Sequence, residues 1–130
     1  MNKKVYIIED DANTLHGLKA NLSHEGFVVE ADQGQEERNT ILNKTKLFKP
    51  DIIILDLVLP AIDGFELLYN IKASEDFNKT KVFIFTNHSD EDTKKRCEDL
   101  GINYYFLKSE FNINEFAQKV KKIINNLDKI

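Results

Sequence analysis

The sequence predicts a doubly wound α/β fold, in which helices cover both faces of a five-stranded parallel sheet. The first observation is a series of five short apolar runs, rich in β-branched and aromatic residues and with little alternation, a pattern typical of strands buried on both faces. The second is their spacing, because the runs begin 22, 25, 30 and 22 residues apart and leave room for one helix in each gap. The expected strands are residues 5–8, 27–29, 52–55, 82–85 and 104–107.

Helical signals occupy the gaps between these runs. In residues 13–24 three leucines recur at helical spacing, and Gly26 follows where a helix would stop. Each of the three later helices is introduced by a capping-box pattern, a Ser, Asp or Asn followed three residues later by an acid. The pairs are Asp63 with Glu66, Ser89 with Asp92, and Asn112 with Glu115. The second gap is less clear, because residues 36–46 offer only Ile41 and Leu42 as apolar anchors.

The composition is that of one folded domain. A chain of 130 residues is long enough to bury one core and too short for two, so we expect a single domain over residues 1–130. With 22 acidic and 18 basic residues the net charge is -4, which argues against direct binding of nucleic acid, because phosphate contacts need Lys and Arg. One cysteine allows no internal disulfide, and no apolar run approaches membrane-spanning length, so we expect a cytoplasmic protein without membrane contact.

Polar side chains follow four of the expected strands. In a doubly wound sheet the functional crevice lies beyond the carboxyl ends of the strands, so these side chains should meet at one rim. They are Glu9, Asp10 and Asp11 after the first run, Asp56 after the third, Thr86 and Asn87 after the fourth, and Lys108 and Ser109 after the fifth. Clustered carboxylates repel one another unless a cation lies among them, and hard oxygen ligands suit Mg²⁺. A carboxylate nucleophile beside a metal, a hydroxyl and a lysine is typical of phosphoryl transfer.

The order and spacing of these residues resemble the receiver domains of two-component response regulators. The matching segments are residues 6–11, residues 51–60, Asp63-Gly64, Phe85-Thr86 and Lys108. Each segment alone is a weak signal, but five in this order at these spacings are specific. The resemblance covers the chain from Lys4 to about Ile124 and implies a flavodoxin-like (β/α)5 fold with strand order 2-1-3-4-5.

The resemblance implies a phosphoryl acceptor and a set of metal ligands. Asp56 would accept a phosphoryl group from a sensor histidine kinase or a phosphotransfer protein, in a reaction that needs Mg²⁺ or, as a substitute, Mn²⁺. Asp10, Asp56 and the backbone carbonyl of Val58 would ligate the ion, and Glu9 would contribute through water. Three consecutive acids follow the first run, and alignment of that run makes Glu9 and Asp10 the acidic pair and leaves Asp11 to begin the next loop.

The resemblance also implies how a signal leaves the site. Lys108 would contact the phosphoryl group, while Thr86 would bond it and move inward on activation. Tyr105, three residues before the lysine, matches the aromatic switch position and would fill the space that Thr86 leaves. The surface of the fourth helix, fifth strand and fifth helix would then change shape and bind a downstream protein. Such a chain is a signalling domain rather than an enzyme, and it catalyses only its own phosphotransfer and slow autodephosphorylation.

Two residues depart from the family pattern. Ser109 follows the lysine where the family usually has proline, and because a cis bond to a non-proline residue costs roughly 3 kcal/mol, we expect the Lys108–Ser109 bond to be trans. Asn87 stands where the family usually has a smaller residue, so it either narrows access to the site or adds a hydrogen-bond donor to it. We also expect weak anchoring of the fourth helix, whose thin apolar stripe comprises Thr93, Cys97 and Leu100.

Three rival functions fit the sequence less well. An FMN-binding flavodoxin shares the strand order but needs a phosphate-cradling loop after the first strand, where this chain is acidic. A phosphatase with an aspartyl-phosphate intermediate, of the haloacid-dehalogenase type, has a second acid two residues after its nucleophile, where this chain has Val58. A degenerate receiver that acts only as a protein-binding module is the other alternative. Because the chain ends shortly after the fifth helix, we expect a stand-alone receiver, the alternative being one domain of a longer protein.

Overall fold

Five parallel strands form one sheet in the order β2-β1-β3-β4-β5, and a helix follows each strand. The computed structural model describes residues 2–127. The strands are β1 (Lys4–Ile8), β2 (Val28–Asp32), β3 (Ile52–Leu55), β4 (Lys81–Thr86) and β5 (Tyr104–Leu107). The helices are α1 (Ala12–His24), α2 (Arg38–Phe48), α3 (Gly64–Ala73), α4 (Glu91–Asp99) and α5 (Ile113–Leu127), with 3₁₀ turns η1 (Glu75–Phe77) and η2 (Lys108–Glu110). The predicted fold class and strand order are confirmed.

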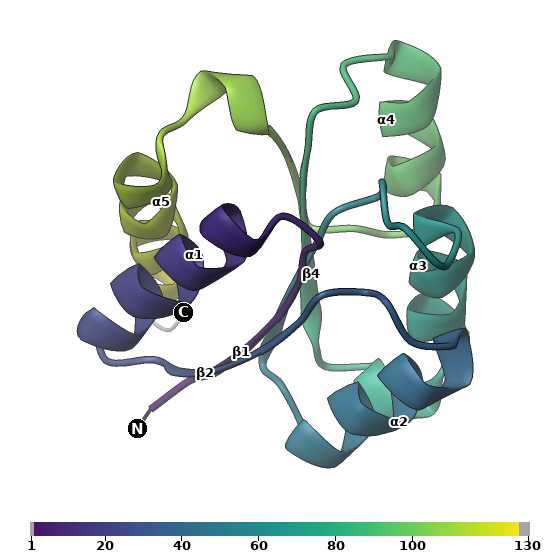
Figure 1. Cartoon of the computed structure of the whole chain (residues 1–130), viewed down its shortest axis with the longest axis horizontal. Coiled ribbons are helices and arrows are strands. Elements are labelled where there is room, and N and C mark those ends of the chain that lie inside the picture. Colours follow the sequence, from purple (N-terminus) through teal and green to yellow (C-terminus); the bar gives the residue numbers. More distant parts are fainter. Residues whose placement is uncertain (1, 128–130) are drawn as a thin grey trace.

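The sheet is covered on both faces, which explains the lack of alternation in its strands. Figure 1 shows α1 and α5 on one face and α2, α3 and α4 on the other. Ile7 and Ile54 belong to the core beneath α1 and α5, whereas Ile8 and Leu55 belong to the core beneath the other three helices. Since both sides of each central strand are apolar, the strands appear in the sequence as continuous hydrophobic runs. No helix within residues 2–127 has the length and apolar character needed to cross a bilayer.

The predicted bounds of the strands are exact for two strands, short by one or two residues for two others, and least accurate for the edge strand β2. The predictions for β3 and β5 match the structure at both ends, and β1 and β4 are longer by one and two residues. The predicted strand at residues 27–29 begins one residue later and continues to Asp32. Because β2 lies at the edge of the sheet, Glu30 faces solvent, and polar residues inside the strand concealed its true end.

The capping box predicted from the sequence is confirmed at α5, is half formed at α3 and is wrong at α4. At α5 the box is complete, since the Asn112 N–H donates to Glu115 and the Glu115 N–H donates to the side chain of Asn112. At α3 the Asp63 side chain accepts from the backbone, but Glu66 pairs with a residue of α2. At α4 the prediction of Ser89 was wrong, because Asp90 is the N-cap and accepts from the N–H of the second helical residue.

Helix α2, the element least clear from the sequence, is held by few buried side chains. Ile41 is fully buried, and Thr45 is buried beside it and donates its hydroxyl to the Ile41 carbonyl at 2.7 Å. The helix ends at Phe48, and the C-cap Lys49 adopts the left-handed conformation with φ of 56° and precedes Pro50. A threonine that satisfies its hydroxyl within its own helix can serve as a core residue, and apolar periodicity does not reveal it.

Candidate functional site at the carboxyl ends of the strands

Two buried carboxylates lie at the carboxyl ends of the central strands β1 and β3. Glu9 follows β1 and is 2% exposed, and Asp56 follows β3 and is 4% exposed. The pairing of Ile8 with Leu55 brings them side by side, and the N–H of Asp56 donates to the Ile8 carbonyl at 3.0 Å. Asp10 is exposed next to them, and one carboxylate oxygen from each of the three acids lies within 4.8 Å of the others. The structure thus brings the three acids together as one cluster.

Lys108, at the end of β5, contacts both buried carboxylates. Its Nζ lies 2.6 Å from Glu9 Oε1 and 2.7 Å from Asp56 Oδ2. Burial lowers the pKa of Lys108, but the hydrogen bonds that its ammonium donates to Asp56 and Glu9 outweigh this effect and raise its pKa overall, so the ammonium keeps its charge. Burial raises the pKa of Glu9 to about 7, although the contact with Lys108 acts to lower it. The site therefore holds more acidic groups than one ammonium can neutralise.

Backbone N–H groups hold the second oxygen of each buried carboxylate. The N–H of Asp11 donates to Glu9 Oε2 at 3.1 Å, and the N–H of Val58 donates to Asp56 Oδ1 at 3.1 Å. The loop that carries Val58 folds tightly against the start of α3, where a Cβ at Gly64 would lie 2.3 Å from the carbonyl oxygen of the loop residue Leu57. Only glycine fits that approach. Both carboxylates are therefore oriented by the chain itself.

A cleft of about 400 Å³ opens above this cluster. Its lining residues are Asp10, Asp11, Thr14, Asp56, Val58, Asn87 and Lys108. These described lining residues offer carboxylate, hydroxyl and carbonyl oxygens and include no thiol or imidazole. All-oxygen donor sets suit a hard divalent cation such as Mg²⁺. The cluster of Glu9, Asp10 and Asp56 fits a divalent cation, and such a cation would offset the acidic excess of the site.

Thr86 and Tyr105, the two predicted switch residues, both form a hydrogen bond with the backbone of His88. Thr86 ends β4 and is fully buried, and its Oγ accepts from the N–H of His88 at 3.4 Å. Tyr105 is partly buried on β5 and donates its hydroxyl to the carbonyl of His88 at 2.7 Å. The segment between β4 and α4 is thus tied at His88 to both predicted switch residues.

Of the two residues that depart from the family pattern, only Asn87 lines the cleft. All peptide bonds within residues 2–127 are trans, which confirms the prediction for Lys108–Ser109. Ser109 is exposed within the 3₁₀ turn η2 and is not among the residues that line the cleft. Asn87 is exposed and lines the cleft, so its side chain is within reach of a group bound there.

One buried carboxylate near this rim was missed from the sequence. Asp32 ends β2, is 5% exposed, and accepts from the Tyr6 hydroxyl at 3.2 Å and the Gly34 N–H at 2.9 Å. Lys44 of α2 lies 3.0 Å from it. The available signal was an acid that ends an edge strand with a lysine twelve residues later, which is too common to identify a pair. This ion pair attaches α2 to the sheet, and Asp32 does not line the acidic cleft.

Known proteins resemble this chain in sequence. The family model of the response regulator receiver domain matches residues 5–121. The chain is 30% identical over 125 residues to the alkaline phosphatase synthesis transcriptional regulatory protein PhoP of Bacillus subtilis (strain 168). The aligned region covers 95% of this chain and 49% of that protein. It is 31% identical over 121 residues to the response regulator ArlR of Staphylococcus aureus (strain Mu50 / ATCC 700699), with 93% and 52% covered. The chain spans about half the length of these curated relatives.

Solved structures show the same fold. The phosphorylated cyanobacterial phytochrome response regulator RcpA matches with a TM-score of 0.78 and 28% identity over 95% of this chain and 91% of that one. A CheY-like receiver domain from Methanospirillum hungatei JF-1 matches with a TM-score of 0.80 and 22% identity over 99% and 98%. Receiver domains are signalling domains that bind a divalent metal in an acidic pocket and interact with histidine kinases and downstream targets, and Glu9, Asp10 and Asp56 form such a pocket here. On the family match, the shared fold and the acidic pocket, this chain belongs to the receiver domains of two-component response regulators.

Proposed function

We propose that Asp56 accepts a phosphoryl group and that the phosphorylated chain signals to another protein. The observation that carries this proposal is the setting of Asp56, which is buried, oriented by Lys108 and the Val58 N–H, and adjacent to an acidic cleft. A carboxylate held in this way needs little reorganisation before it attacks phosphorus. The ammonium beside it is ready to receive the negative charge that the reaction brings.

The proposed reaction is an in-line displacement. A carboxylate oxygen of Asp56 bonds to the phosphorus of a phosphohistidine on a sensor histidine kinase or phosphotransfer protein, while the P–N bond breaks and the imidazole keeps the electron pair and takes up a proton. The products are an acyl phosphate on Asp56 and a neutral histidine on the donor. Lys108 transfers its contact from the carboxylate to the phosphoryl oxygens, so a favourable charge interaction is kept throughout.

Magnesium is the ion that we propose for the acidic pocket, with Mn²⁺ as a substitute. Asp10, Asp56 and the Val58 carbonyl would hold the ion, and Glu9 would contribute through water. When bound, the ion supplies positive charge to the transferring phosphoryl oxygens. The contribution of the chain is to fix the orientation of Asp56 and Glu9 through backbone N–H groups before the ion arrives.

We propose that the signal leaves through His88 and α4. Phosphorylation adds charge of about -1.5 to -2 at Asp56, and the Thr86 hydroxyl, at the end of β4, would turn toward it. That turn would release the N–H of His88, and Tyr105, which holds the carbonyl of the same residue, would move with it. The population would shift toward a second arrangement of α4, β5 and α5, the surface proposed to bind a downstream protein.

The rival activities are not favoured. Two residues after Asp56 the chain has the exposed apolar Val58, so the second acid of a phosphatase site is missing from that position. The loop after β1 is acidic at Asp10 and Asp11, unlike a loop that cradles the phosphate of FMN. We propose that residues 1–130 act as one receiver domain in the cytoplasm.

The test is the intact mass of the protein after incubation with acetyl phosphate. The wild type with Mg²⁺ is expected to gain one phosphoryl group, and the gain should disappear with EDTA. Asp56→Asn should gain none. The matched control is Asp51→Asn, which changes an exposed aspartate at the opposite end of β3 and should be phosphorylated like the wild type. A wild type that gains no phosphoryl mass with Mg²⁺ present would overturn the proposal.

A further inference from the structure

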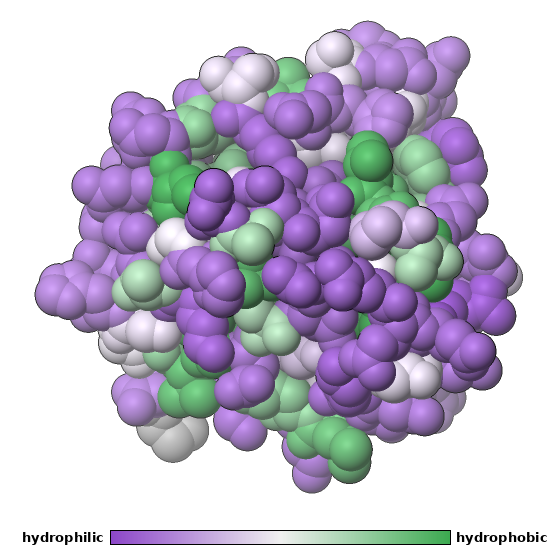
Figure 2. All heavy atoms as spheres, viewed as in Figure 1, coloured by the Kyte–Doolittle hydropathy of each residue, from purple (hydrophilic) through white to green (hydrophobic). Residues whose placement is uncertain are grey.

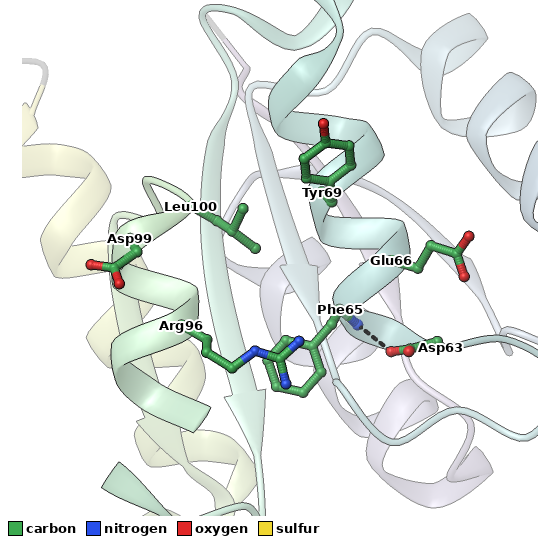
Figure 3. Close-up of a pocket in the computed structure, with 7 residues that line it drawn as sticks. All are labelled: Asp63, Phe65, Glu66, Tyr69, Arg96, Asp99 and Leu100. Carbon is green, nitrogen blue, oxygen red and sulfur yellow. Dashed lines mark hydrogen bonds between the residues drawn. The ribbon is translucent and has the colours of Figure 1, made fainter. Parts of the chain in front are cut away.

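A groove of about 540 Å³ lies between α3 and α4 and shares no lining residue with the acidic cleft. Its apolar lining consists of Phe65 and Tyr69 of α3 and Leu100 at the end of α4. Figure 3 shows Tyr69 and Leu100 on facing sides of the space between the two helices. Tyr69 is 60% exposed, so much of this apolar surface is open to solvent. An apolar groove of this kind can accept a protruding side chain from a partner.

The groove carries an excess of negative charge. Asp63, the N-cap of α3, Glu66 of α3 and Asp99 of α4 line it, and Figure 3 shows the carboxylates of Glu66 and Asp99 on opposite sides. The one basic lining residue, Arg96, stacks on Phe65 with its guanidinium carbon 4.0 Å from the ring centre. Three acids against one arginine favour an apolar occupant that is flanked by positive charge.

The carboxylates of the groove can accept new partners at small cost. Glu66 pairs with Arg38 of α2, and Asp99 lies 3.7 Å from Lys95 one turn away on its own helix. All four side chains are exposed by a third or more, and exposed pairs of this kind contribute little to stability. Either carboxylate can therefore leave its present partner and pair with a lysine of an incoming molecule at little cost in free energy.

The end of α2 has the features that this groove favours. Leu47 is 81% exposed, more than any other large hydrophobic side chain in residues 2–127. It lies between Lys46, which pairs with Asp76 at 3.1 Å, and Lys49, which makes no ion pair among the described residues. Figure 2 shows hydrophobic atoms at the lower end of α2 and around α3, each surrounded by hydrophilic surface. One molecule thus carries a basic apolar knob and an acidic apolar groove.

The fold allows two copies to use both features at once. Figure 1 shows α2, α3 and α4 in one layer on the same face of the sheet, with α3 between the other two. Each of these helices returns from the carboxyl edge of the sheet to its amino edge, so the last turns of α2 and α4 lie at the same level. If a second copy is related to the first by a two-fold axis parallel to α3, the helix ends of both copies stay at the same level. The rotation then brings α2 of each copy against α4 of the other.

We propose that this face associates with a second copy of the chain, with Leu47 of one copy in the α3–α4 groove of the other. Leu47 would contact Leu100 and Tyr69, and Lys49 would face Asp99. The two Tyr69 side chains would lie near the axis. The contact consists of one helix end and one groove in each direction, so it is small, and we expect a dissociation constant on the order of 0.1 mM.

The experiment is sedimentation velocity of the full chain at increasing concentration, with Leu47→Glu and Tyr69→Glu as test variants. The wild type should show a weight-average mass that rises toward that of a dimer, and each variant should remain monomeric. Both altered side chains are exposed, so the fold should be retained, which circular dichroism checks. The matched control is Leu127→Glu, because Leu127 is an exposed leucine at the end of α5, outside both features. It should associate like the wild type.

A charge exchange tests the pairing itself. Lys49→Glu and Asp99→Lys should each weaken association at least threefold, and the double variant should recover it, because the opposite charges again face each other across the interface. A wild type that stays monomeric up to 1 mM, on the order of ten times the expected dissociation constant, would overturn the proposal. So would a dimer that persists in Leu47→Glu, because that result assigns association to another face. Failure of the double variant to recover would contradict the proposed geometry.

Discussion

Lys108 acts in two directions at the acidic cluster, because its ammonium lies within 2.7 Å of oxygens on both Glu9 and Asp56. In the free protein it offsets two buried carboxylates. Toward a divalent cation it is a competitor for those same oxygens, and toward a phosphoryl group it is a source of positive charge. Its removal therefore affects metal binding and phosphorylation with opposite signs.

We predict that Lys108→Met binds Mg²⁺ roughly tenfold more tightly and accepts a phosphoryl group roughly a hundredfold more slowly than the wild type. Titration calorimetry measures the affinity, and intact mass after incubation with acetyl phosphate measures the rate. Lys119→Met, on the exposed surface of α5, is the control and should change neither quantity. If affinity and rate fall together in Lys108→Met, the lysine has only a structural role.

Asp10 is the exposed member of the acidic cluster and lies within 4.8 Å of two buried carboxylates. In the absence of a cation its charge is repelled by theirs, so we predict that Asp10→Asn unfolds at higher urea, with a gain of a few tenths of a kcal/mol to about 1 kcal/mol. The wild type should gain stability when Mg²⁺ is added, because the ion binds only the folded state, and the variant should gain much less.

The control for this prediction is Asp11→Asn. Asp11 caps α1 through Thr14, and asparagine caps almost as well, so this change removes a neighbouring charge and preserves the helix end. It should leave the stabilisation by Mg²⁺ nearly intact. Equal loss of that stabilisation in both variants would mean that the metal-binding pair is not Glu9 and Asp10.

Helix α4 is weakly attached to the sheet compared with α5. Only Thr93 and Cys97 are buried along it, whereas α5 buries five side chains. Its last turn and the groove beside it are open, and the segment before it is held at His88 by Thr86 and Tyr105. An element with so few buried apolar contacts opens at low free energy, which suits a surface that changes on phosphorylation.

We predict that the amides of α4 exchange hydrogen faster than those of α5, by roughly ten- to a hundredfold. Cys97 offers a second readout, because it is the only cysteine and is fully buried. Burial also raises the pKa of its thiol to about 11, so it should react with thiol reagents only when α4 opens. Exchange in α4 no faster than in α5 would contradict this description of the helix.

The start of α4 also provides a test of the observed cap. Because Asp90 and not Ser89 accepts from the helix backbone, Asp90→Ala should lower the free energy of unfolding by about 1 kcal/mol. Ser89→Ala should change it by less than about 0.5 kcal/mol, since Ser89 is exposed and outside the helix. Urea unfolding of both variants measures the difference. A larger loss in Ser89→Ala would restore the original capping prediction.

The sheet as a whole explains which features could be predicted from the sequence. Its central strands are buried on both faces, so their apolar runs gave the order of elements and the four residues of β3. The parallel arrangement then brought Glu9, Asp56 and Lys108 to one rim, because strand ends meet regardless of their separation in the chain.

The parts that could not be predicted depend on contacts between elements. The end of β2 was hidden because Asp32 is buried through Tyr6 and Lys44 rather than through hydrophobicity. The cap of α4 depends on where the preceding loop turns, and two adjacent polar residues, Ser89 and Asp90, offer the same local chemistry. The groove between α3 and α4 combines side chains from two helices whose facing sides no local pattern reveals.

The most direct test of the central claim is the position of the phosphoryl group on the chain. The protein is incubated with acetyl phosphate and Mg²⁺, reduced with borohydride, which converts an aspartyl phosphate into homoserine, and digested for peptide sequencing by mass spectrometry. We predict homoserine at position 56 and at no other aspartate, and none in Asp56→Asn. Homoserine at Asp10 or Asp11 instead, or a wild type without homoserine in the presence of Mg²⁺, would contradict the account.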